Sequence, residues 1–224
     1  MSLYLYQKVL SVNFSVLRIL RENEKVSFNE NKLLGILIHK TDPEDEIVIC
    51  VDGDDDGVRF VLDSWTAQYS HVKMIKVYQR KLNKDFAAQK NSVIENSTGD
   101  YIFHLDADET PHEILLIQLK DILEMNDVDL VWIPRVNTVD GITEDHIQKW
   151  GWVQNDKGWI NYPDYQARVF RRAKHIHWIR PVHEHITGAK TYAHLPPHEE
   201  LSLYHHKQID KQEQQNEMYK GILG

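Results

Sequence analysis

Strand-sized apolar runs alternate with helical segments along the first 135 residues, and this alternation limits the possible fold more than any other feature. The expected strands cover residues 13–20, 46–51, 73–78, 101–105 and 129–134. Apolar residues at helical spacing lie between them, for example Leu33, Leu34, Leu37 and Ile38. Because strands that alternate with helices join a sheet through crossover connections, the pattern predicts an α/β fold with a mostly parallel, doubly wound sheet. Ligands of such sheets bind beyond the carboxyl ends of the strands.

Two capping patterns predict where helices start. Ser27 with Glu30 has the form of a capping box. Thr110 with Glu113 has the same form, and Pro111 stands at the expected first helical position. We therefore expect one helix to start at each box, the second soon after strand 101–105.

The second half of the chain has a different composition. Five of the six tryptophans, counted from Trp132, and nine of the thirteen histidines, counted from His146, lie there. Helical periodicity is weak until a polar helix begins near Asp210. We expect a β-rich and loop-rich half that packs on the same sheet. The sequence thus predicts a single domain over residues 1–224, with a ligand-binding half at 9–135 and a second half at 136–224.

Composition and charge narrow the class of protein. The 224-residue chain is 42% hydrophobic and 27% charged, as is ordinary for a globular domain. Its formal net charge of −8 argues against nucleic-acid binding by phosphate neutralisation. No apolar run approaches the roughly eighteen residues of a membrane helix, and no signal-peptide pattern is present, so we expect neither a transmembrane segment nor secretion. The lone Cys50 fits a reducing compartment, and we expect a cytoplasmic protein.

Acidic residues gather in a turn after the strand at 46–51. The turn at 52–57, D-G-D-D-D-G, fits the first half of an EF-hand calcium loop. The strand-like segment before it opposes that interpretation, as does Arg59 at a position where an apolar residue is expected, and both favour a solvated turn. Asp52 differs, because at the strand end its carboxylate could accept a hydrogen bond from a nucleotide base or ribose.

Asp106 and Asp108 follow the strand at 101–105 with one residue between them. Two such acids can place hard oxygen ligands on Mg²⁺ or Mn²⁺ while substrate phosphates complete the coordination shell. The bare pair also describes a surface turn. An acidic cleft would repel a nucleotide diphosphate unless a divalent cation came with it, so the pair indicates a phosphate-binding site that depends on a metal.

Several segments resemble the family 2 glycosyltransferases of GT-A fold, namely DEIVICVDG at 45–53, DFAAQKN at 85–91 and TGDYIFHLDADE at 98–109. Two later segments resemble the branch that includes bacterial lipopolysaccharide and cell-surface polysaccharide glucosyltransferases, namely YQARVFRR at 165–172 and VHE at 182–184. The resemblance implies a Rossmann-like, mixed and mostly parallel sheet flanked by helices, with a β-rich and loop-rich acceptor half. The turn RENE at 21–24 departs from the family's usual turn after the first strand.

The resemblance also implies binding roles. Asp52 would hydrogen-bond the nucleotide base, Lys90 would lie near the base or the diphosphate, and Asp106 would contact the ribose or the metal. Asp108 would ligate Mn²⁺ or Mg²⁺ directly, and His205 would be the late histidine that reaches the metal.

A carboxylate is expected to take the proton of the acceptor hydroxyl, because a hydroxyl is a poor nucleophile at neutral pH. By its order along the chain Glu184 corresponds to the family's catalytic acid, and Asp164 is the alternative. A base on the far side of the sugar from the leaving group gives inversion. On the acceptor side we expect Trp150, Trp152 and His183, because flat indole faces suit stacking on sugar rings.

The sequence therefore predicts an inverting, metal-dependent glycosyltransferase. Its donor would be a nucleotide sugar, most readily a UDP-sugar, and its acceptor a glycan or glycolipid, which would allow peripheral membrane contact. One alternative is a non-catalytic module that binds a nucleotide sugar or Ca²⁺. Another is a metal-dependent hydrolase built on histidine pairs with strand spacing, His175 with His177 and His183 with His185.

Overall fold

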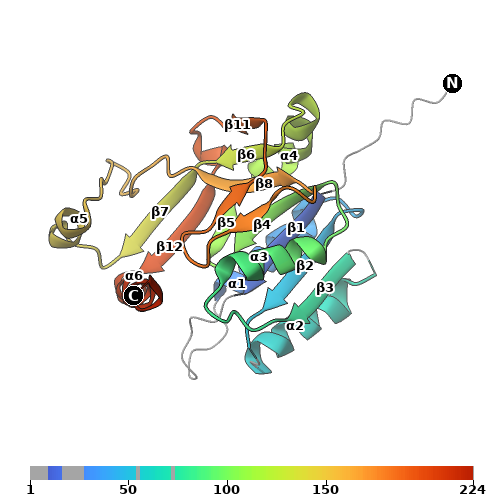
Figure 1. Ribbon diagram of the computed structural model, residues 1–224, viewed down its shortest axis with the longest axis horizontal. Helices are drawn as coiled ribbons and strands as arrows, with labels where there is room; N and C mark the ends of the chain where they lie inside the picture. The colour runs from blue at the N-terminus through green and yellow to red at the C-terminus, as the bar shows by residue number, and fades with distance from the viewer. Residues whose placement is uncertain (1–9, 17–27, 54–55, 72–73, 224) are drawn as a thin grey trace.

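The computed structural model describes residues 10–16, 28–53, 56–71 and 74–223 (Figure 1). A seven-stranded sheet lies at its centre, in the order β11-β6-β8-β4-β1-β2-β3. Its strands, in chain order, are β1 Leu10–Val16, β2 Glu46–Val51, β3 Met74–Gln79, β4 Tyr101–Asp106, β6 Leu130–Ile133, β8 Gln166–Arg171 and β11 Tyr192–His194.

The central sheet is mixed and mostly parallel. β1 runs parallel to β2 and β4, β2 runs parallel to β3, and β6 runs parallel to β11. β8 is antiparallel to both of its neighbours, β4 and β6. The predicted α/β fold with a mixed, mostly parallel sheet is confirmed.

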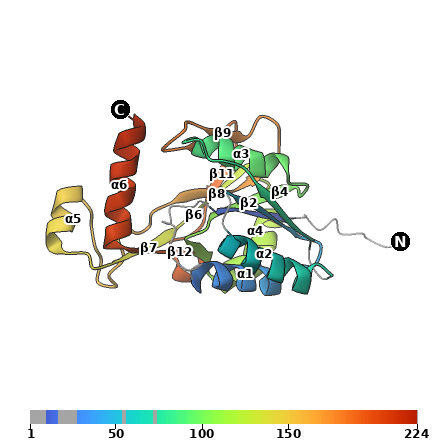
Figure 2. The same cartoon turned by 90° about the horizontal axis from the view of Figure 1, so that it is seen from below.

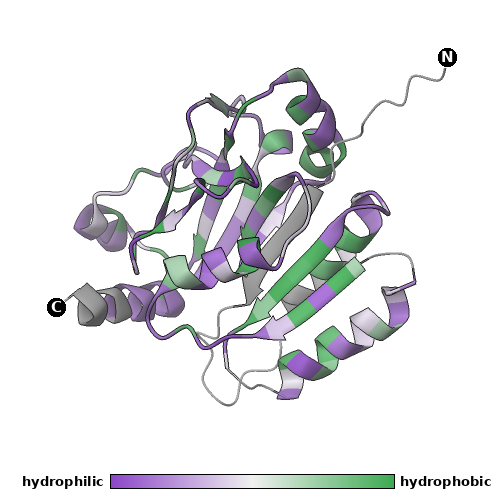
Figure 3. Ribbon diagram, turned by 45° about the vertical axis from the view of Figure 1, so that its right-hand side comes forward, coloured by the Kyte–Doolittle hydropathy of each residue, from purple (hydrophilic) through white to green (hydrophobic). Residues whose placement is uncertain are grey.

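Helices cover both faces of this sheet (Figure 2). α1 Phe28–Lys40, α2 Asp56–Tyr69 and α4 Glu113–Met125 lie on one face, while α3 Phe86–Glu95 lies on the other. All six residues of β2 are buried, as expected for a strand that is covered on both sides. Figure 3 shows the apolar residues concentrated on the strands of the sheet, whereas the C-terminal helix is hydrophilic where it is coloured.

A three-stranded sheet, β5-β12-β7, stands beside the central one. Its strands are β5 Glu109–Pro111, β7 Arg135–Asp140 and β12 Leu203–Gln208. β12 continues into α6 Ile209–Leu223, which projects away from the strands beside α5 Glu144–Trp150 (Figure 2). The remaining elements are the hairpin of β9 His177–Ile179 and β10 His185–Thr187, and a short 3₁₀ turn at Glu199–Leu201.

Some predicted boundaries were wrong. The box at Thr110 does not start a helix, because residues 109–111 form β5 and pair with β12. Instead, α4 begins after His112. The Nδ1 atom of His112 accepts a hydrogen bond from the Ile114 N–H at 3.1 Å. The first strand begins at Leu10 rather than at residue 13, and α5 was not predicted. Ser27 and residues 17–20 lie outside the described residues.

Candidate active site

A cavity of about 650 Å³ opens at the carboxyl end of β4. β4 and the turn after it, β7, β8, the loop before β10, β12 and α6 all contribute to its walls. Asp106, Asp108, Asp164, Glu184 and His205 all line it. The parallel strands β1 and β4 end near this cavity, where ligands of doubly wound sheets bind.

Asp106 is the last residue of β4, and cations face both of its carboxylate oxygens. Oδ1 lies 3.2 Å from the Lys90 ammonium, and Oδ2 lies 2.7 Å from Nη2 of Arg168. Burial opposes ionisation of this carboxyl, but Arg168 and Lys90 outweigh it and hold the pKa of Asp106 well below its ordinary value. Asp106 is therefore a carboxylate that the protein itself already neutralises.

Asp106 belongs to a row of alternating charges that we call the buried ion chain. Each member lies between 2.6 and 3.2 Å from the next, in the order Glu184, Lys90, Asp106, Arg168, Glu109, Arg135, Asp164. Lys90 is only 2% exposed, and Glu109 is fully buried. Burial lowers the pKa of the Arg168 guanidinium, but Asp106 and Glu109 more than compensate and raise it. Five of its seven members line the cavity, and the chain connects the two predicted candidates for the base.

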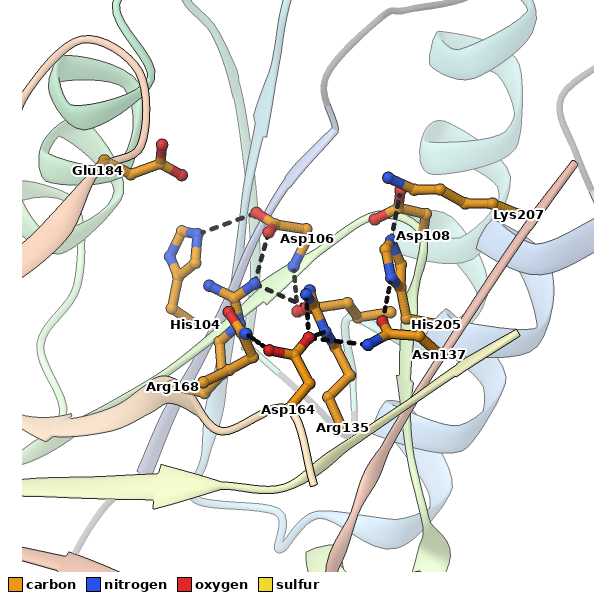
Figure 4. Close-up of polar contacts among 12 residues, drawn as sticks. His104, Asp106, Asp108, Arg135, Asn137, Asp164, Arg168, Glu184, His205 and Lys207 are labelled. Atoms are coloured by element: carbon orange, nitrogen blue, oxygen red, sulfur yellow. Dashed lines mark hydrogen bonds and ion pairs between the residues drawn. The ribbon is translucent and has the colours of Figure 1, made fainter. Parts of the chain in front are cut away.

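His104 lies within β4 beside the ion chain. Its side chain is 0% exposed, and Nε2 lies 3.7 Å from Oδ1 of Asp106 (Figure 4). Burial lowers the pKa of His104 to about 4, because the nearby acid does not offset the loss of water. At neutral pH the imidazole is therefore uncharged.

Asp108 has surroundings unlike those of Asp106. Its side chain is 48% exposed, and Oδ2 lies 3.3 Å from Nε2 of His205 on β12 (Figure 4). The other ring nitrogen of His205 lies 2.7 Å from Oδ1 of Asn137, a contact that orients the imidazole. Desolvation opposes ionisation of Asp108, but His205 and Lys207 together lower its pKa to about 2.

Asp108 and His205 have the donor chemistry of a divalent-cation site. A carboxylate oxygen and an imidazole nitrogen face each other at the cavity wall, and Mg²⁺ in such sites keeps several waters and substrate phosphates beside one or two protein carboxylates. Among the described residues there is no group of three or more His, Cys, Asp or Glu side chains arranged to hold a metal. The Asp108–His205 pair therefore fits a cation that takes few protein ligands, and Asp106 stands apart from it.

Glu184 precedes β10, in a loop that α3 holds in place. Oε1 of Glu184 lies 2.6 Å from the Lys90 ammonium, and the side chain is 17% exposed. The next α3 residue, Asn91, donates to the carbonyl of Trp178 and accepts from its N–H, each at 2.8 Å, as a strand neighbour would. Neighbouring residues of α3 thus fix both the hairpin and the carboxylate that it carries.

Asp164 has little freedom to accept a proton. Its Oδ2 accepts from Arg135 and from the Asn137 amide, and its Oδ1 accepts from Gln166 at 2.9 Å. Burial raises the pKa of Asp164, but Arg135 and the amide donors lower it further. Both carboxylate oxygens are committed to the protein.

The predicted nucleotide contacts lie in different surroundings. Oδ1 of Asp52 accepts from the Leu82 N–H at 2.9 Å, and Asp52 is not among the described residues that line the cavity. Lys90 is buried between Asp106 and Glu184 rather than open to the cleft. Both nucleotide roles stay predictions.

The predicted acceptor residues also separate. Trp152 and His183 line the cavity. Trp150, the last residue of α5, is not among the described residues that line it, but its ring centroid lies 4.7 Å from that of Trp152. Their acceptor roles stay predictions.

The sequence allows two alternative metal sites, the calcium loop at 52–57 and the histidine pairs, and the structure describes only part of the first. Asp54 and Asp55 of the expected calcium loop lie outside the described residues, and a strand, β2, precedes that turn. His177 and His185 lie on the paired strands β9 and β10. Neither set forms a metal-holding group of three or more side chains within the described residues.

Lys90 was a predicted site residue, but the two arginines of the ion chain had no predicted role. Arg168 stands among buried apolar residues of β8, and a charged residue inside an apolar strand is a signal of a buried ion pair. Glu109 appeared only within the segment at 98–109 and had no predicted role, although it is buried.

None of the described helices combines the length and the apolar character needed to cross a membrane.

The chain is similar to several known proteins. The family model described as "Glycosyl transferase family 2" matches residues 26–186, well over half of the chain. A Bacillus subtilis (strain 168) protein named "Putative glycosyltransferase EpsE" is 38% identical over 64 residues, which cover 29% of this chain and 22% of that protein.

Solved structures of S. aureus TarS resemble the fold. TarS 1–349 in complex with UDP-GlcNAc has a TM-score of 0.59 at 15% identity, covering 89% of this chain and 58% of that one. TarS 1–349 in complex with UDP has a TM-score of 0.56 at 14% identity, covering 88% and 60%. The chain thus spans less than two thirds of the proteins that it matches.

Proposed function

The chain belongs to glycosyl transferase family 2 and has a GT-A fold, and from this premise we propose that it transfers a sugar from a nucleotide-diphosphate donor to an acceptor hydroxyl. The transfer proceeds with inversion at the anomeric carbon. The observation that carries the proposal is the arrangement of Figure 4, in which Glu184 lies on one side of Asp106 and the Asp108–His205 pair on the other, along one cavity.

The donor side of this proposal lies at Asp108 and His205. They would hold Mg²⁺ or Mn²⁺, which would supply positive charge to the diphosphate of the donor. TarS binds UDP and UDP-GlcNAc in its crystal structures, which supports a UDP-sugar as the donor of this chain. Asp106, already neutralised by Lys90 and Arg168, orients the site rather than ligating the cation.

Glu184 is the proposed general base. Lys90 fixes one of its carboxylate oxygens, and an ionised carboxylate at the cavity wall can accept the acceptor's proton as the new bond forms. Glu184 lies across Asp106 from the proposed diphosphate site, and this arrangement supports an approach to the sugar from the face opposite the leaving group, as inversion requires. Asp164 is the weaker candidate, because its oxygens already accept hydrogen bonds from Arg135, Asn137 and Gln166.

The variant Glu184→Gln tests the assignment. It keeps the shape of the side chain and removes the proton acceptor, so we expect sugar transfer to fall by roughly 10²- to 10⁴-fold. UDP affinity in the presence of Mn²⁺, measured by calorimetry, should stay within about threefold of wild type. The anomeric configuration of the wild-type product, read by NMR, tests inversion directly.

Glu200→Gln is the matched control, because Glu200 is an exposed carboxylate of the 3₁₀ turn. It should transfer sugar at the wild-type rate. Glu184 is not the base if Glu184→Gln, folded by circular dichroism, keeps near wild-type turnover. A wild-type protein that binds UDP but never consumes any nucleotide sugar would instead support the non-catalytic alternative.

The acceptor in this proposal is a hydroxyl of a glycan or glycolipid. Trp152 and His183 at the cavity wall support a sugar acceptor, because an indole face can stack on a sugar ring. A cytoplasmic site of action, with peripheral contact to a membrane that carries a lipid-linked acceptor, belongs to the same proposal. Transfer to vesicle-borne glycolipid, compared with transfer to the free glycan, would test it.

A further inference from the structure

Lys207 differs from the other cations of the candidate active site in its partner. Lys90, Arg168 and Arg135 each lie within 3.2 Å of a carboxylate. Lys207 donates instead to Oε1 of Gln215 on α6, a neutral amide. In the part of the chain that the structure describes, Lys207 forms no ion pair within 4.0 Å, although it lines the same cavity.

The pleat of β12 places Lys207 with the proposed metal ligand. Residues two apart on a strand point to the same face, about 7 Å from each other along the strand. His205 faces Asp108, while His206 faces the opposite way and lies 3.0 Å from Asp140. Lys207 is thus one pleat beyond the Asp108–His205 pair, and its charge acts on Asp108 (Figure 4).

The charge balance of the cavity calls for such a cation. The buried ion chain contains four carboxylates and three cations, so it keeps one net negative charge, and Asp108 adds a second. A divalent ion would only cancel these two charges. No net positive charge would then be left to face a diphosphate that carries two negative charges in the donor and gains a third as it leaves. Catalysis needs fixed positive charge where the leaving group develops its negative charge.

We propose that Lys207 binds the β-phosphate of the nucleoside diphosphate, exchanging the amide of Gln215 for a phosphate oxygen when the donor binds. This assignment rests on the proposed function and adds a phosphate-binding residue to it. It lies outside the matched family region, which ends at residue 186, so β12 and α6 complete a site that the matched segment begins. α6 then acts as a wall that holds the lysine ready over the cavity.

Calorimetry with UDP and with UMP, each with Mn²⁺, tests the proposal on the full chain. Lys207→Met removes the charge and keeps most of the apolar stem. UDP affinity should fall about tenfold to a hundredfold, because a charged hydrogen bond is lost. UMP lacks a β-phosphate, so its affinity should stay within about threefold. Lys207→Arg should recover most of the UDP affinity.

Lys211→Met is the matched control, because it removes the same charge from an exposed lysine of the same cavity wall. It should weaken UDP binding by less than about threefold, since exposed charge is screened. Equal losses in the two variants, or equal losses for UDP and UMP, would overturn the role of Lys207. A wild type that binds neither UDP nor GDP would overturn the proposed function itself, a result that the wild-type titration alone distinguishes.

Discussion

Only one residue separates Asp106 from Asp108 in the chain, yet the fold gives the two acids opposite surroundings. Asp106 ends a buried strand, with Lys90 and Arg168 against its two oxygens. Asp108 follows in a turn, is 48% exposed and faces His205 across a cavity. The contrast teaches that a D-x-D pattern at a strand end need not supply two equivalent ligands, because one acid can be neutralised by the protein and the other left to a ligand.

The two surroundings also differ in what a substitution leaves behind. A buried carboxylate that loses its cation remains in a dry environment without compensation, whereas an exposed one is rehydrated. We therefore expect changes around Asp106 to alter the free energy of unfolding and changes around Asp108 to alter ligand affinity. The predictions below test that division, beginning with the largest effect.

Arg168→Met should have the largest effect on stability. It leaves Asp106 and Glu109 without the guanidinium that lies 2.7 Å from each. Breaking a buried ion pair by removing one partner costs about 3–5 kcal/mol. Urea unfolding at pH 7 should show a loss of that size in the free energy of unfolding.

The double variant Arg168→Met with Glu109→Gln provides the control. Neutralising the stranded acid should return part of the lost stability, since Glu109 is fully buried and no longer needs a counter-charge. If Arg168→Met unfolds at the wild-type urea concentration, Arg168 does not stabilise the fold by neutralising Asp106 and Glu109.

The sequence predicted the elements of the central sheet well, because their signals are local. β2 is a continuous apolar run with six buried residues, and β4 leads directly into the two acids. The predicted helix start at Thr110 failed because β5 pairs with β12, more than ninety residues away in the chain. A capping pattern records local preference and carries no information on such pairing.

The candidate site was predicted only in part, for the same reason. The residue types of Asp108, His205 and Glu184 suggested chemistry, and the three line one cavity, although their roles stay predictions. The division of labour between Asp106 and Asp108 depends on Arg168, a strand residue about sixty positions later. Nothing in the spacing of the two acids indicates which one a distant arginine contacts.

Acidification should lower the free energy of unfolding through His104, which is buried beside Asp106. Its pKa in the folded protein is about 4, below the ordinary 6.5, so the unfolded chain binds the proton first as pH falls. Stability from this residue is therefore present above about pH 6.5 and is lost as pH falls towards 4. The loss should approach about 3 kcal/mol, from 1.4 kcal/mol per pKa unit.

Urea unfolding at pH 7 and pH 4.5 would measure this, with His104→Phe as the control. Phenylalanine keeps the ring and removes the titrating group, so the variant should lose distinctly less stability between the two pH values. Identical pH dependence in wild type and His104→Phe would contradict a buried neutral histidine.

Asp108 is half-exposed at the cavity, so Asp108→Asn should change UDP affinity more than the free energy of unfolding. Loss of a second-sphere contact to a metal site typically costs 10- to 100-fold in affinity, and loss of a ligand should cost at least that. UDP binding in the presence of Mn²⁺ should therefore weaken by about tenfold or more, while the free energy of unfolding changes by less than about 1 kcal/mol. A variant that binds UDP and Mn²⁺ normally would place the metal elsewhere.

The smallest effect on the free energy of unfolding is expected at Lys157 and Glu199. They form an ion pair on the surface, with a distance close to those of the Arg168 pairs. Their charged atoms lie 3.2 Å apart, but the lysine side chain is 61% exposed. Exposed pairs contribute about 0.2–1 kcal/mol, because water already solvates both charges and salt screens them. Lys157→Gln should therefore lower the free energy of unfolding by less than about 1 kcal/mol, and 0.5 M NaCl should remove most of that difference. If Lys157→Gln lowers the free energy of unfolding as much as Arg168→Met does, the distance within an ion pair rather than its burial sets its contribution to stability. The contrast between Asp106 and Asp108 would then lose its physical basis.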